Sequence, residues 1–448
     1  MLAGLLLSLP TPTLPSPQAQ SSGPTEGERI AIRAERIILR PGVELTKGTL
    51  LLERGVVVRV GQDLSIPEGV RVVEGAVACA GFVDPWSSLG LDPDSVGDLG
   101  ASAATRSIDA LDPWLVPAER REALLAGVTS ARVQIARGAL IAGIGALVQT
   151  TERSEPSVVR EDACLAGSVG VSRGGRTGDI FDRAGEVDRL VGALEKGKRY
   201  RESQVDFKKE LETWTKAIAE KLAELEKDFK KAKKDREKDE KDAKEKGKEF
   251  KDKKYKEDKK PRRPRFDPDD EALARAVDGE LPLVVEVHRA SEIRRLLDRT
   301  AGFDRLRLVL AGATEALAFA DELVERRIPV ILWPAPMGTS RPDEYEGHDL
   351  ALAGALAREG VRVLIGSGGG GDAQELRFLA ALAVGHGMEP AAALAAITSA
   401  PAAVFDAGDR LGTLEPGRSG DVLVFDGDPL DTRATLRAVV SRGEVVFP

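Results

Sequence analysis

The sequence predicts an α/β fold: a (β/α)8 TIM-like barrel joined to a small β-sandwich built from both termini. Short β-branched runs alternate with helical stretches through the middle of the chain, which is typical of a parallel sheet flanked by helices. Both ends of the chain hold short strands separated by glycine-rich turns, the pattern of antiparallel strands. A charged segment interrupts the alternation and is interpreted as a helical insertion.

The predicted barrel covers residues 81–404, and the predicted sandwich combines 28–80 with 405–448. Inside the barrel, the apolar run Leu283 to Val287 is followed by the helical stretch Glu292 to Asp298, and similar pairs recur along the chain. An extent of about 320 residues fits a (β/α)8 barrel with insertions.

The insertion, residues 198–265, contains 27 basic and 18 acidic residues, a net charge of +9. Because the whole chain has a net charge of −8, the remainder has −17. The second half of the insertion, Lys230 to Lys260, is nearly all Lys, Asp and Glu, and is expected to be a solvated helix or disordered. A docking arm for an acidic partner is the alternative. Since the basic charge lies outside the folded body, we expect no nucleic-acid binding.

The first half of the insertion has an apolar stripe at helical spacing, which indicates a coiled-coil helix. The stripe consists of Phe207, Leu211, Trp214, Ile218, Leu222, Leu225 and Phe229.

The N-terminal segment, residues 1–27, resembles the later part of a secretory signal. Leu2 to Leu9 is apolar, and Gln18 to Gln20 is a candidate cleavage site. No basic residue precedes the apolar run, so the segment is interpreted either as a signal for periplasmic or extracellular export or as a disordered tail of a cytoplasmic protein. No apolar run is long enough to span a bilayer. Cys79 and Cys164 are too few for a disulfide framework or a zinc cluster and are expected to be buried.

Five motifs follow one another along the chain. Gly81-Phe-Val-Asp-Pro-Trp-Ser-Ser-Leu-Gly90 is similar to G-F-I-D-x-H-x-H-x-G, and Gly127-Val-Thr-Ser-Ala-Arg132 to G-V-T-T-x-R. His288-Arg-Ala-Ser-Glu-Ile293 is similar to the end of H-x-H-R-A-x-D-I, and Gly312-Ala-Thr-Glu-Ala316 to H-G-T-E-A. The segment Leu411 to Asp426 closely resembles a closing signature. Together these motifs resemble the amidohydrolase superfamily, specifically its imidazolonepropionase-like metal-dependent hydrolases, over the chain outside the insertion.

The resemblance implies a barrel that hydrolyses cyclic amides or peptide-like C–N bonds with a divalent metal, but the ligand positions depart from the family's pattern. Residues that bind metal poorly or not at all stand where the family has its first two histidines, a third histidine and the late aspartate; they are Trp86, Ser88, Ala311 and Gly368. In the H-x-H-R-A strand, Glu286 replaces the first histidine and only His288 remains.

Metal-assisted hydrolysis needs a cation that lowers the pKa of a bound water, and zinc-like ions take about four ligands from His, Asp, Glu or Cys. The chain has three histidines, His288, His348 and His386, of which only His288 lies in one of these motifs. We therefore expect no metal cofactor. The alternative is one divalent metal such as zinc, bound by Glu286, His288 and Asp372.

The sequence thus favours an amidohydrolase-like pseudoenzyme that acts as a binding or partner subunit, either of an active relative or in a homo-oligomer. In this interpretation Trp86 fills the space that the metals occupy in the family. Glu286 and His288 then form an ion pair in a pocket that has lost its catalytic function. The alternative is an active hydrolase with an atypical or mononuclear site, in which Glu286, His288 and Asp372 are catalytic. Whether the chain is an enzyme remains open at this point.

Overall fold

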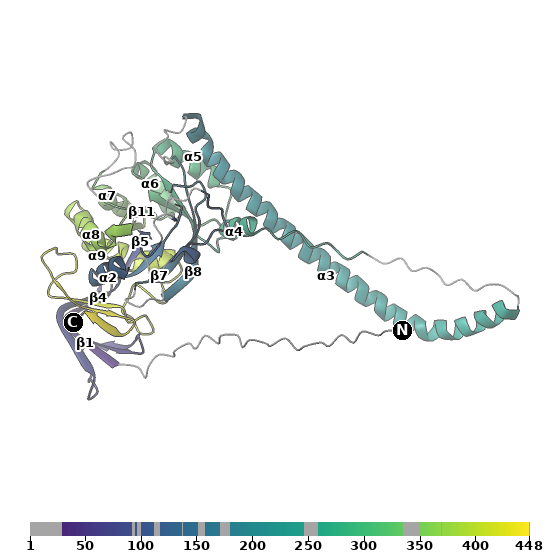
Figure 1. The fold of residues 1–448 in the computed structure, drawn as a ribbon, viewed down its shortest axis with the longest axis horizontal. Helices are drawn as coiled ribbons and strands as arrows, with labels where there is room; N and C mark the ends of the chain where they lie inside the picture. Colours follow the sequence, from purple (N-terminus) through teal and green to yellow (C-terminus); the bar gives the residue numbers. More distant parts are fainter. Residues whose placement is uncertain are drawn as a thin grey trace, which may run out of the picture.

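The computed structural model describes residues 29–91, 95, 100–111, 117–136, 138–150, 157–170, 180–245, 259–334, 349–368 and 370–447. The signal-like segment 1–27, residues 246–258 of the insertion and His348 lie outside the described residues. The described chain forms two β-sheets and a set of helices (Figure 1). None of its helices is both long enough and apolar enough to cross a membrane.

Seven strands from both ends of the chain share one sheet, in the order β15-β14-β13-β4-β1-β2-β3. The strands are β1 (Arg29–Arg40), β2 (Val43–Glu53), β3 (Val56–Gly61), β4 (Arg71–Ala80), β13 (Val422–Phe425), β14 (Leu436–Ser441) and β15 (Glu444–Phe447). β1 and β4 are parallel, and the other neighbours are antiparallel. Ile30 and Ile32 lie on one face of β1 and pack in the same core as Leu50 and Val424. The expected sandwich is therefore a single hydrogen-bonded sheet joined through β4 and β13.

The middle of the chain forms an eight-stranded, nearly closed sheet, in the order β12-β11-β10-β9-β8-β7-β6-β5. The strands are β5 (Phe82–Ser87), β6 (Val128–Val133), β7 (Gly143–Gln149), β8 (Ser157–Ser168), β9 (Leu283–Val287), β10 (Leu308–Gly312), β11 (Val330–Leu332) and β12 (Val363–Ile365). A hydrogen bond of 3.1 Å from the Ser367 N–H, just after β12, to Asp84 of β5 links the two ends of the sheet.

One strand departs from the regular (β/α)8 pattern. β7 runs antiparallel to both β6 and β8, whereas the other neighbouring strands in the sheet order are parallel. Antiparallel neighbours can be joined by tight turns, while parallel strands need a crossover, usually a helix. The eight strands thus follow one another in chain order around the sheet, but no helix lies between β6 and β8 among the residues that the structure describes there.

Helices cover the outside of the barrel (Figure 1). They are α2 (Pro117–Leu125), α4 (Pro268–Val277), α5 (Ala290–Thr300), α6 (Ala320–Glu325), α7 (Leu352–Arg358), α8 (Leu376–Gly385), α9 (Pro390–Ala396) and α10 (Ser399–Val404). The start of α4 is fixed locally, because the Asp267 side chain accepts the N–H groups of Asp269 and Asp270, and Pro268 occupies the first turn. α5 buries one apolar face, formed by Ile293, Leu296 and Leu297.

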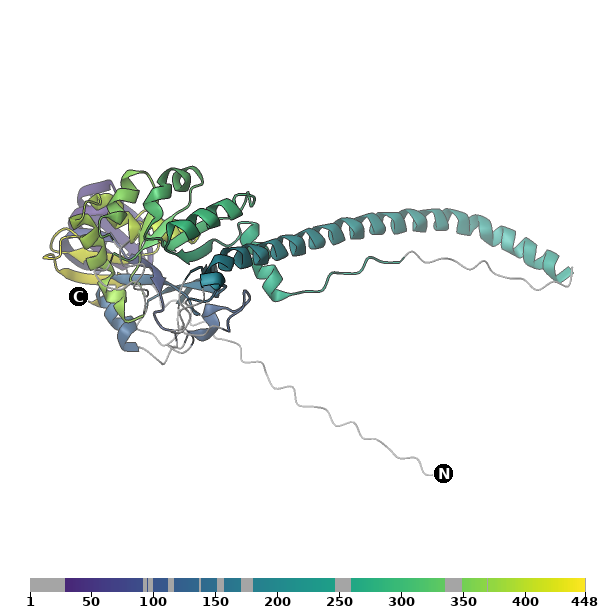
Figure 2. The same cartoon turned by 90° about the horizontal axis from the view of Figure 1, so that it is seen from above.

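The insertion forms the helix α3 (Ile180–Glu245), which is far longer than the others. Its first turns belong to the body, where Val187, Leu190 and Leu194 are buried in the main core. Beyond these turns the helix leaves the body as an arm, and residues 259–267 return alongside it (Figures 1 and 2).

Candidate functional site

The candidate residues gather where the parallel strands end. Trp86 is near the end of β5, Ala311 near the end of β10, and His288 follows β9 directly. The carboxyl ends of parallel strands meet at one mouth of a barrel, where active sites of this fold lie. Trp86, Ala311 and His288 therefore lie at the carboxyl ends of their strands.

Two indole rings dominate the site. Trp86, which is 3% exposed, stacks on Trp333 with ring centroids 5.3 Å apart and an interplanar angle of 26°. The His288 ring meets Trp333 edge-on, with centroids 6.1 Å apart. Offset stacks and edge-to-face contacts are the favourable arrangements of such rings. Trp86, Trp333 and His288 thus form one packed group inside the mouth.

Arg132 of β6 lies next to this group and is completely buried. Its Nε donates a hydrogen bond of 2.6 Å to the Pro85 carbonyl oxygen. Its guanidinium carbon is 4.8 Å from the centre of the Trp86 ring and 5.5 Å from that of Phe405. Such cation–π contacts are strongest where water is excluded. The guanidinium therefore places a fixed positive charge beside Trp86.

Asp84 of β5 provides the nearby negative charge and is also completely buried. It accepts the N–H groups of Trp86 (3.0 Å) and Ser367 (3.1 Å), and the Ser367 hydroxyl donates to it at 2.5 Å. Burial raises the pKa of Asp84, and these hydrogen bonds together with the charge of Arg132 oppose that rise. Asp84 thereby holds the segment after β12 against β5.

Glu286 and His288 are two residues apart at the end of β9, on the same face of the strand. The distance from Glu286 Oε1 to His288 Nε2 is 3.7 Å, and both side chains are largely buried. His288 Nδ1 has no hydrogen-bond partner among the described residues. A Cβ at Gly312 would lie 2.4 Å from His288 Cε1, so the close approach of β10 to the imidazole needs glycine there. Glu286 and His288 thus lie close together at the end of β9, and their ion pair stays a prediction.

The other candidates are placed less closely together. Ser88 is buried just after β5, and Ala311 is fully buried between β9 and β11. Gly368 has a φ of +86°, and a Cβ there would contact the Trp333 side chain at 3.5 Å. Asp372 lies in the 3-10 helix η4 (Gly370–Glu375), but its side chain is outside the described part of the chain. Its expected place beside Glu286 and His288 therefore stays a prediction.

Three residues of the site, Asp84, Arg132 and Trp333, were not among the candidates chosen from the sequence. Asp84 and Arg132 are in quoted motifs, and a charged residue inside an otherwise apolar, buried strand is a signal that could have been weighed. Trp333 follows a short strand and matches no motif, so only the fold reveals its contact with Trp86.

The donor set does not fit a divalent metal. Indole, methyl and glycine groups stand at Trp86, Ala311 and Gly368, and none of them offers a metal-binding atom. Across the ranges that the structure describes, no three His, Cys, Asp or Glu side chains are grouped so that they could hold a metal ion. The residues brought together here are suited to stacking and hydrogen bonding.

Part of the chain matches a known protein family. A model of the Amidohydrolase family matches residues 310–447, which run from β10 to β15. A search of curated proteins gave no match.

Solved structures of similar fold include an amidohydrolase from Thermotoga maritima, with 22% identity, a TM-score of 0.70, and coverage of 93% of this chain and 99% of that one. They also include ochratoxinase from A. niger, with 15% identity, a TM-score of 0.54, and coverage of 94% and 96%. A third is a Xaa-Pro dipeptidase with bound methionine, with 12% identity, a TM-score of 0.53, and coverage of 94% and 100%. At these identities the likeness concerns the fold.

The family match covers the C-terminal part of the chain, and the fold agrees over nearly all of it. Residues 310–447 thus match the Amidohydrolase family, and the fold of nearly the whole chain is similar to that of a solved amidohydrolase.

Proposed function

We propose that this protein is an amidohydrolase-like subunit without metal-dependent catalysis, which acts by binding or by assembling with a partner. The stack of Trp86 on Trp333, with the Arg132 guanidinium beside it, is the observation that supports this proposal. By resemblance, Trp86 stands at the position of a metal-binding histidine in the family. The buried ring fills part of the space that a metal and its water would need.

Electrostatics supports the same conclusion. A divalent cation beside Trp86 would be repelled by the buried guanidinium, because two positive charges interact strongly where water is excluded. Asp84 is the nearby carboxylate, but its oxygens already accept hydrogen bonds from Trp86 and Ser367. A metal that used Asp84 would have to displace these hydrogen bonds.

Elemental analysis tests the absence of a metal directly. The full chain would be equilibrated with zinc, manganese or iron, separated from free ions by gel filtration, and analysed by mass spectrometry of the elements. We expect far less than one ion per chain. The matched control is His288→Ala, because a specific site would lose its metal in this variant, whereas background binding would not change. About one ion per chain, lost in His288→Ala, would overturn the proposal.

A second candidate function is hydrolysis of an amide or peptide-like C–N bond by Glu286 and His288. Their 3.7 Å approach, together with a His288 Nδ1 that has no partner among the described residues, favours it. A carboxylate beside an imidazole can act as a general acid–base pair. The structural relatives include a Xaa-Pro dipeptidase, so X-Pro dipeptides and cyclic amides are the substrates to test.

The two functions are separated by turnover. If Glu286 and His288 are catalytic, Glu286→Gln and His288→Ala should each abolish hydrolysis, while Ser203→Ala, on α3 and outside the mouth, should leave it unchanged. Equal turnover in all four proteins would remove Glu286 and His288 as catalytic residues. The leading proposal predicts no turnover above background in any of them.

A further inference from the structure

We infer that residues 259–266, which return alongside the α3 arm, form an ordered cationic ridge that binds an extended acidic segment of a partner protein. This inference rests on the binding role proposed above and deepens it by naming the chemistry of the partner. It does not depend on whether a metal binds in the barrel.

The ridge has the burial pattern of a polyproline II helix. Pro261, Pro264 and Asp267 are half-buried, whereas the two residues that follow each proline are exposed. A polyproline II helix has three residues per turn, so residues three apart share one face. One face of the ridge therefore lies against the molecule, and its other two faces point to solvent.

The apolar residues of α3 account for the covered face of the ridge. Phe207, Leu211, Trp214 and Ile218 are half-buried, although they lie on the part of α3 that has left the body. The Lys260 ammonium lies 5.9 Å from the centre of the Trp214 ring. Proline-rich segments dock on aromatic side chains in peptide-binding domains, because a polyproline II helix loses little entropy on docking. The arm thus supports the ridge and limits its motion.

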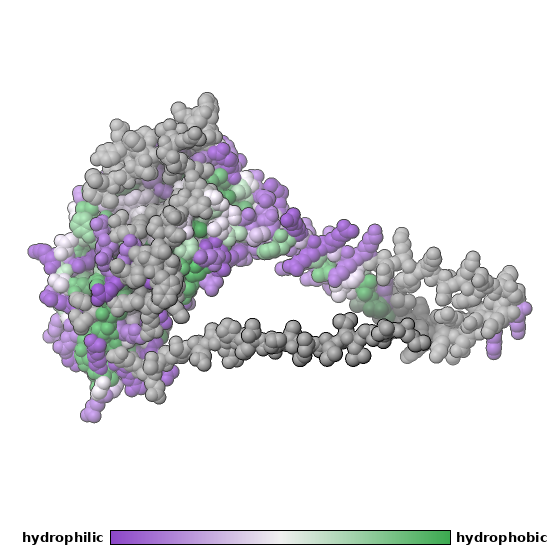
Figure 3. Space-filling model, viewed as in Figure 1, coloured by the Kyte–Doolittle hydropathy of each residue, from purple (hydrophilic) through white to green (hydrophobic). Residues whose placement is uncertain are grey.

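Five cations occupy the two exposed faces of the ridge. Lys259, Arg262 and Arg265 share one face, and Lys260 and Arg263 lie on the other. A rise of 3.1 Å per residue spreads them over about 19 Å. Among the residues that the structure describes, none of the five forms an ion pair with a carboxylate. The side of the described arm seen in Figure 3 is mainly hydrophilic, with separate hydrophobic patches, so charge is what the ridge offers to a partner.

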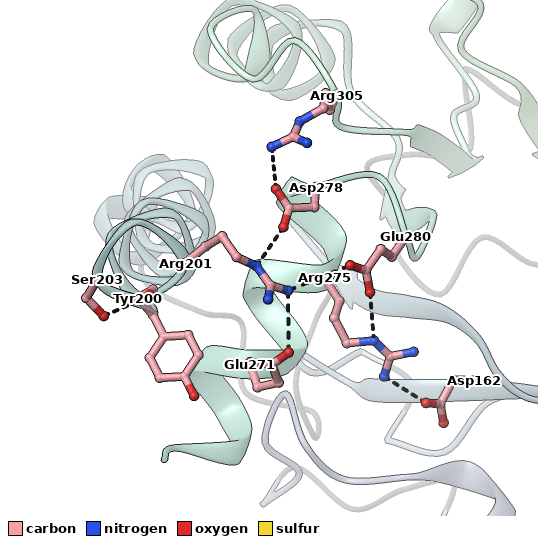
Figure 4. A network of polar contacts seen from close by, with 9 residues as sticks. All are labelled: Asp162, Tyr200, Arg201, Ser203, Glu271, Arg275, Asp278, Glu280 and Arg305. Carbon is pink, nitrogen blue, oxygen red and sulfur yellow. Dashed lines mark hydrogen bonds and ion pairs between the residues drawn. The ribbon is translucent and has the colours of Figure 1, made fainter. Parts of the chain in front are cut away.

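The carboxylates of α4, into which the ridge leads, already have partners. At the root of the arm, Arg201 of α3 pairs with Glu271 (3.4 Å) and Asp278 (2.6 Å), as Figure 4 shows. Lys196 of α3 pairs with Asp270 at 2.8 Å. These ion pairs also hold α3 against α4, so both supports of the ridge are fixed relative to each other. The cations of the ridge are therefore available to another chain.

The distribution of charge favours a narrow ligand. The chain outside residues 198–265 has a net charge of −17, and α4 begins with Asp269, Asp270 and Glu271 directly beyond the ridge. A membrane or a DNA duplex is broad enough to meet these acidic parts as well, and like charges repel within roughly 8–10 Å at physiological salt. An extended peptide rich in Asp and Glu can follow the ridge alone. Phe266, which is 63% exposed, offers an apolar contact at its end.

Fluorescence anisotropy of a labelled octaglutamate peptide, titrated with the full chain, tests the ridge. We expect saturable binding that weakens as salt rises from about 50 to 300 mM, because exposed ion pairs are screened. Arg262→Glu combined with Arg265→Glu, on one face of the ridge, should weaken binding at least tenfold. The matched control is Lys209→Glu combined with Lys216→Glu, two exposed residues on the far side of α3 from the half-buried ones. It changes the net charge equally and should bind within about threefold of the unaltered protein.

A second variant separates an ordered ridge from a simple run of positive charges. Trp214→Ala removes the ring beside Lys260 but keeps every cation, so binding should weaken at least threefold as the ridge loses its support. Undiminished binding by Arg262→Glu with Arg265→Glu, or by Trp214→Ala, would overturn the inference. Tighter binding of phosphatidylserine vesicles or of a ten-nucleotide single-stranded DNA than of octaglutamate would also overturn it. None of these measurements involves a metal, so failure of the ridge is distinguishable from failure of the proposed function.

Discussion

The barrel interior and the α3 arm both depart from the usual placement of residues in core and surface, but in opposite directions. The interior buries charged side chains, and the arm exposes an apolar one. Charged residues are normally exposed and large apolar ones buried. In the interior, Arg132 and Asp84 are completely buried, whereas on the arm Leu222 is 57% exposed. The two regions therefore show how one chain stabilises buried charges and an exposed apolar residue.

The two regions differ in which groups compensate for these unfavourable placements. The buried charges are matched within the chain, because Arg132 has the Pro85 carbonyl and the Trp86 ring, and Asp84 has three hydrogen bonds. On the described arm, Phe207, Leu211, Trp214 and Ile218 are half-buried, Lys260 of the returning segment lies over the Trp214 ring, and Leu222 is exposed. The buried charges are thus compensated mainly by neighbours in the barrel, whereas Leu222 on the arm remains exposed.

Removing a ring from the interior should have the largest effect. Trp86→Ala deletes a side chain that packs against Trp333 and Arg132, and we expect it to lower the free energy of unfolding by about 3–5 kcal/mol. Leu222→Ala on the arm should change the unfolding of the barrel by less than about 0.5 kcal/mol. Thermal unfolding of both variants, followed by calorimetry, checks the contrast. Similar melting temperatures for the two would mean that the Trp86 stack does not stabilise the barrel.

An attempt to restore a family ligand should have a smaller effect. Gly368→Asp places an aspartate where the family is expected to have one, but the φ of +86° is unfavourable for a side chain and costs about 1–2 kcal/mol. A Cβ at this position also contacts Trp333. We expect a lower melting temperature and no zinc uptake in a titration. Stoichiometric zinc binding by this variant would show that the interior is closer to a metal site than its packing suggests.

Much of the fold could be predicted because it depends on local pattern. Glycine-rich turns and alternating strands at both ends indicated the sheet that β1 to β4 share with β13 to β15, and the closing signature indicated the family. The direction of β7 could not be predicted, since a short apolar strand has the same pattern in parallel and antiparallel sheets.

The site was predicted only where its residues belong to motifs. Glu286 and His288 are two residues apart on one strand, so their pairing follows from strand geometry alone. The contacts of Trp86 with Trp333 and Arg132 join three separate strands or strand ends, and depend on how the barrel closes. No periodicity in one segment can reveal such contacts.

The smallest expected effect concerns the pH dependence of stability. Because burial raises the pKa of Asp84, the folded state holds this proton more tightly than the unfolded state. The contribution of Asp84 to stability is therefore greatest at acidic pH and falls as pH rises through the folded pKa. Asp84→Asn cannot titrate, so the melting-temperature difference between the unaltered protein and this variant should narrow as pH rises from about 4 to 7.

Asp426 is the control with the opposite sign. Its pKa is lowered, first by the hydrogen bond from the Thr435 N–H and then by Arg437, so its stabilising effect is present above the unfolded pKa and lost as pH falls. For Asp426→Asn, the difference from the unaltered protein should widen as pH rises from about 2 to 5. If the melting-temperature difference for Asp84→Asn instead widened as pH rises, the pKa of Asp84 would be lowered on folding, as it is for the exposed Asp426. Burial would then not control the ionisation of Asp84, and the closed interior would not differ from the exposed parts of the chain in this respect.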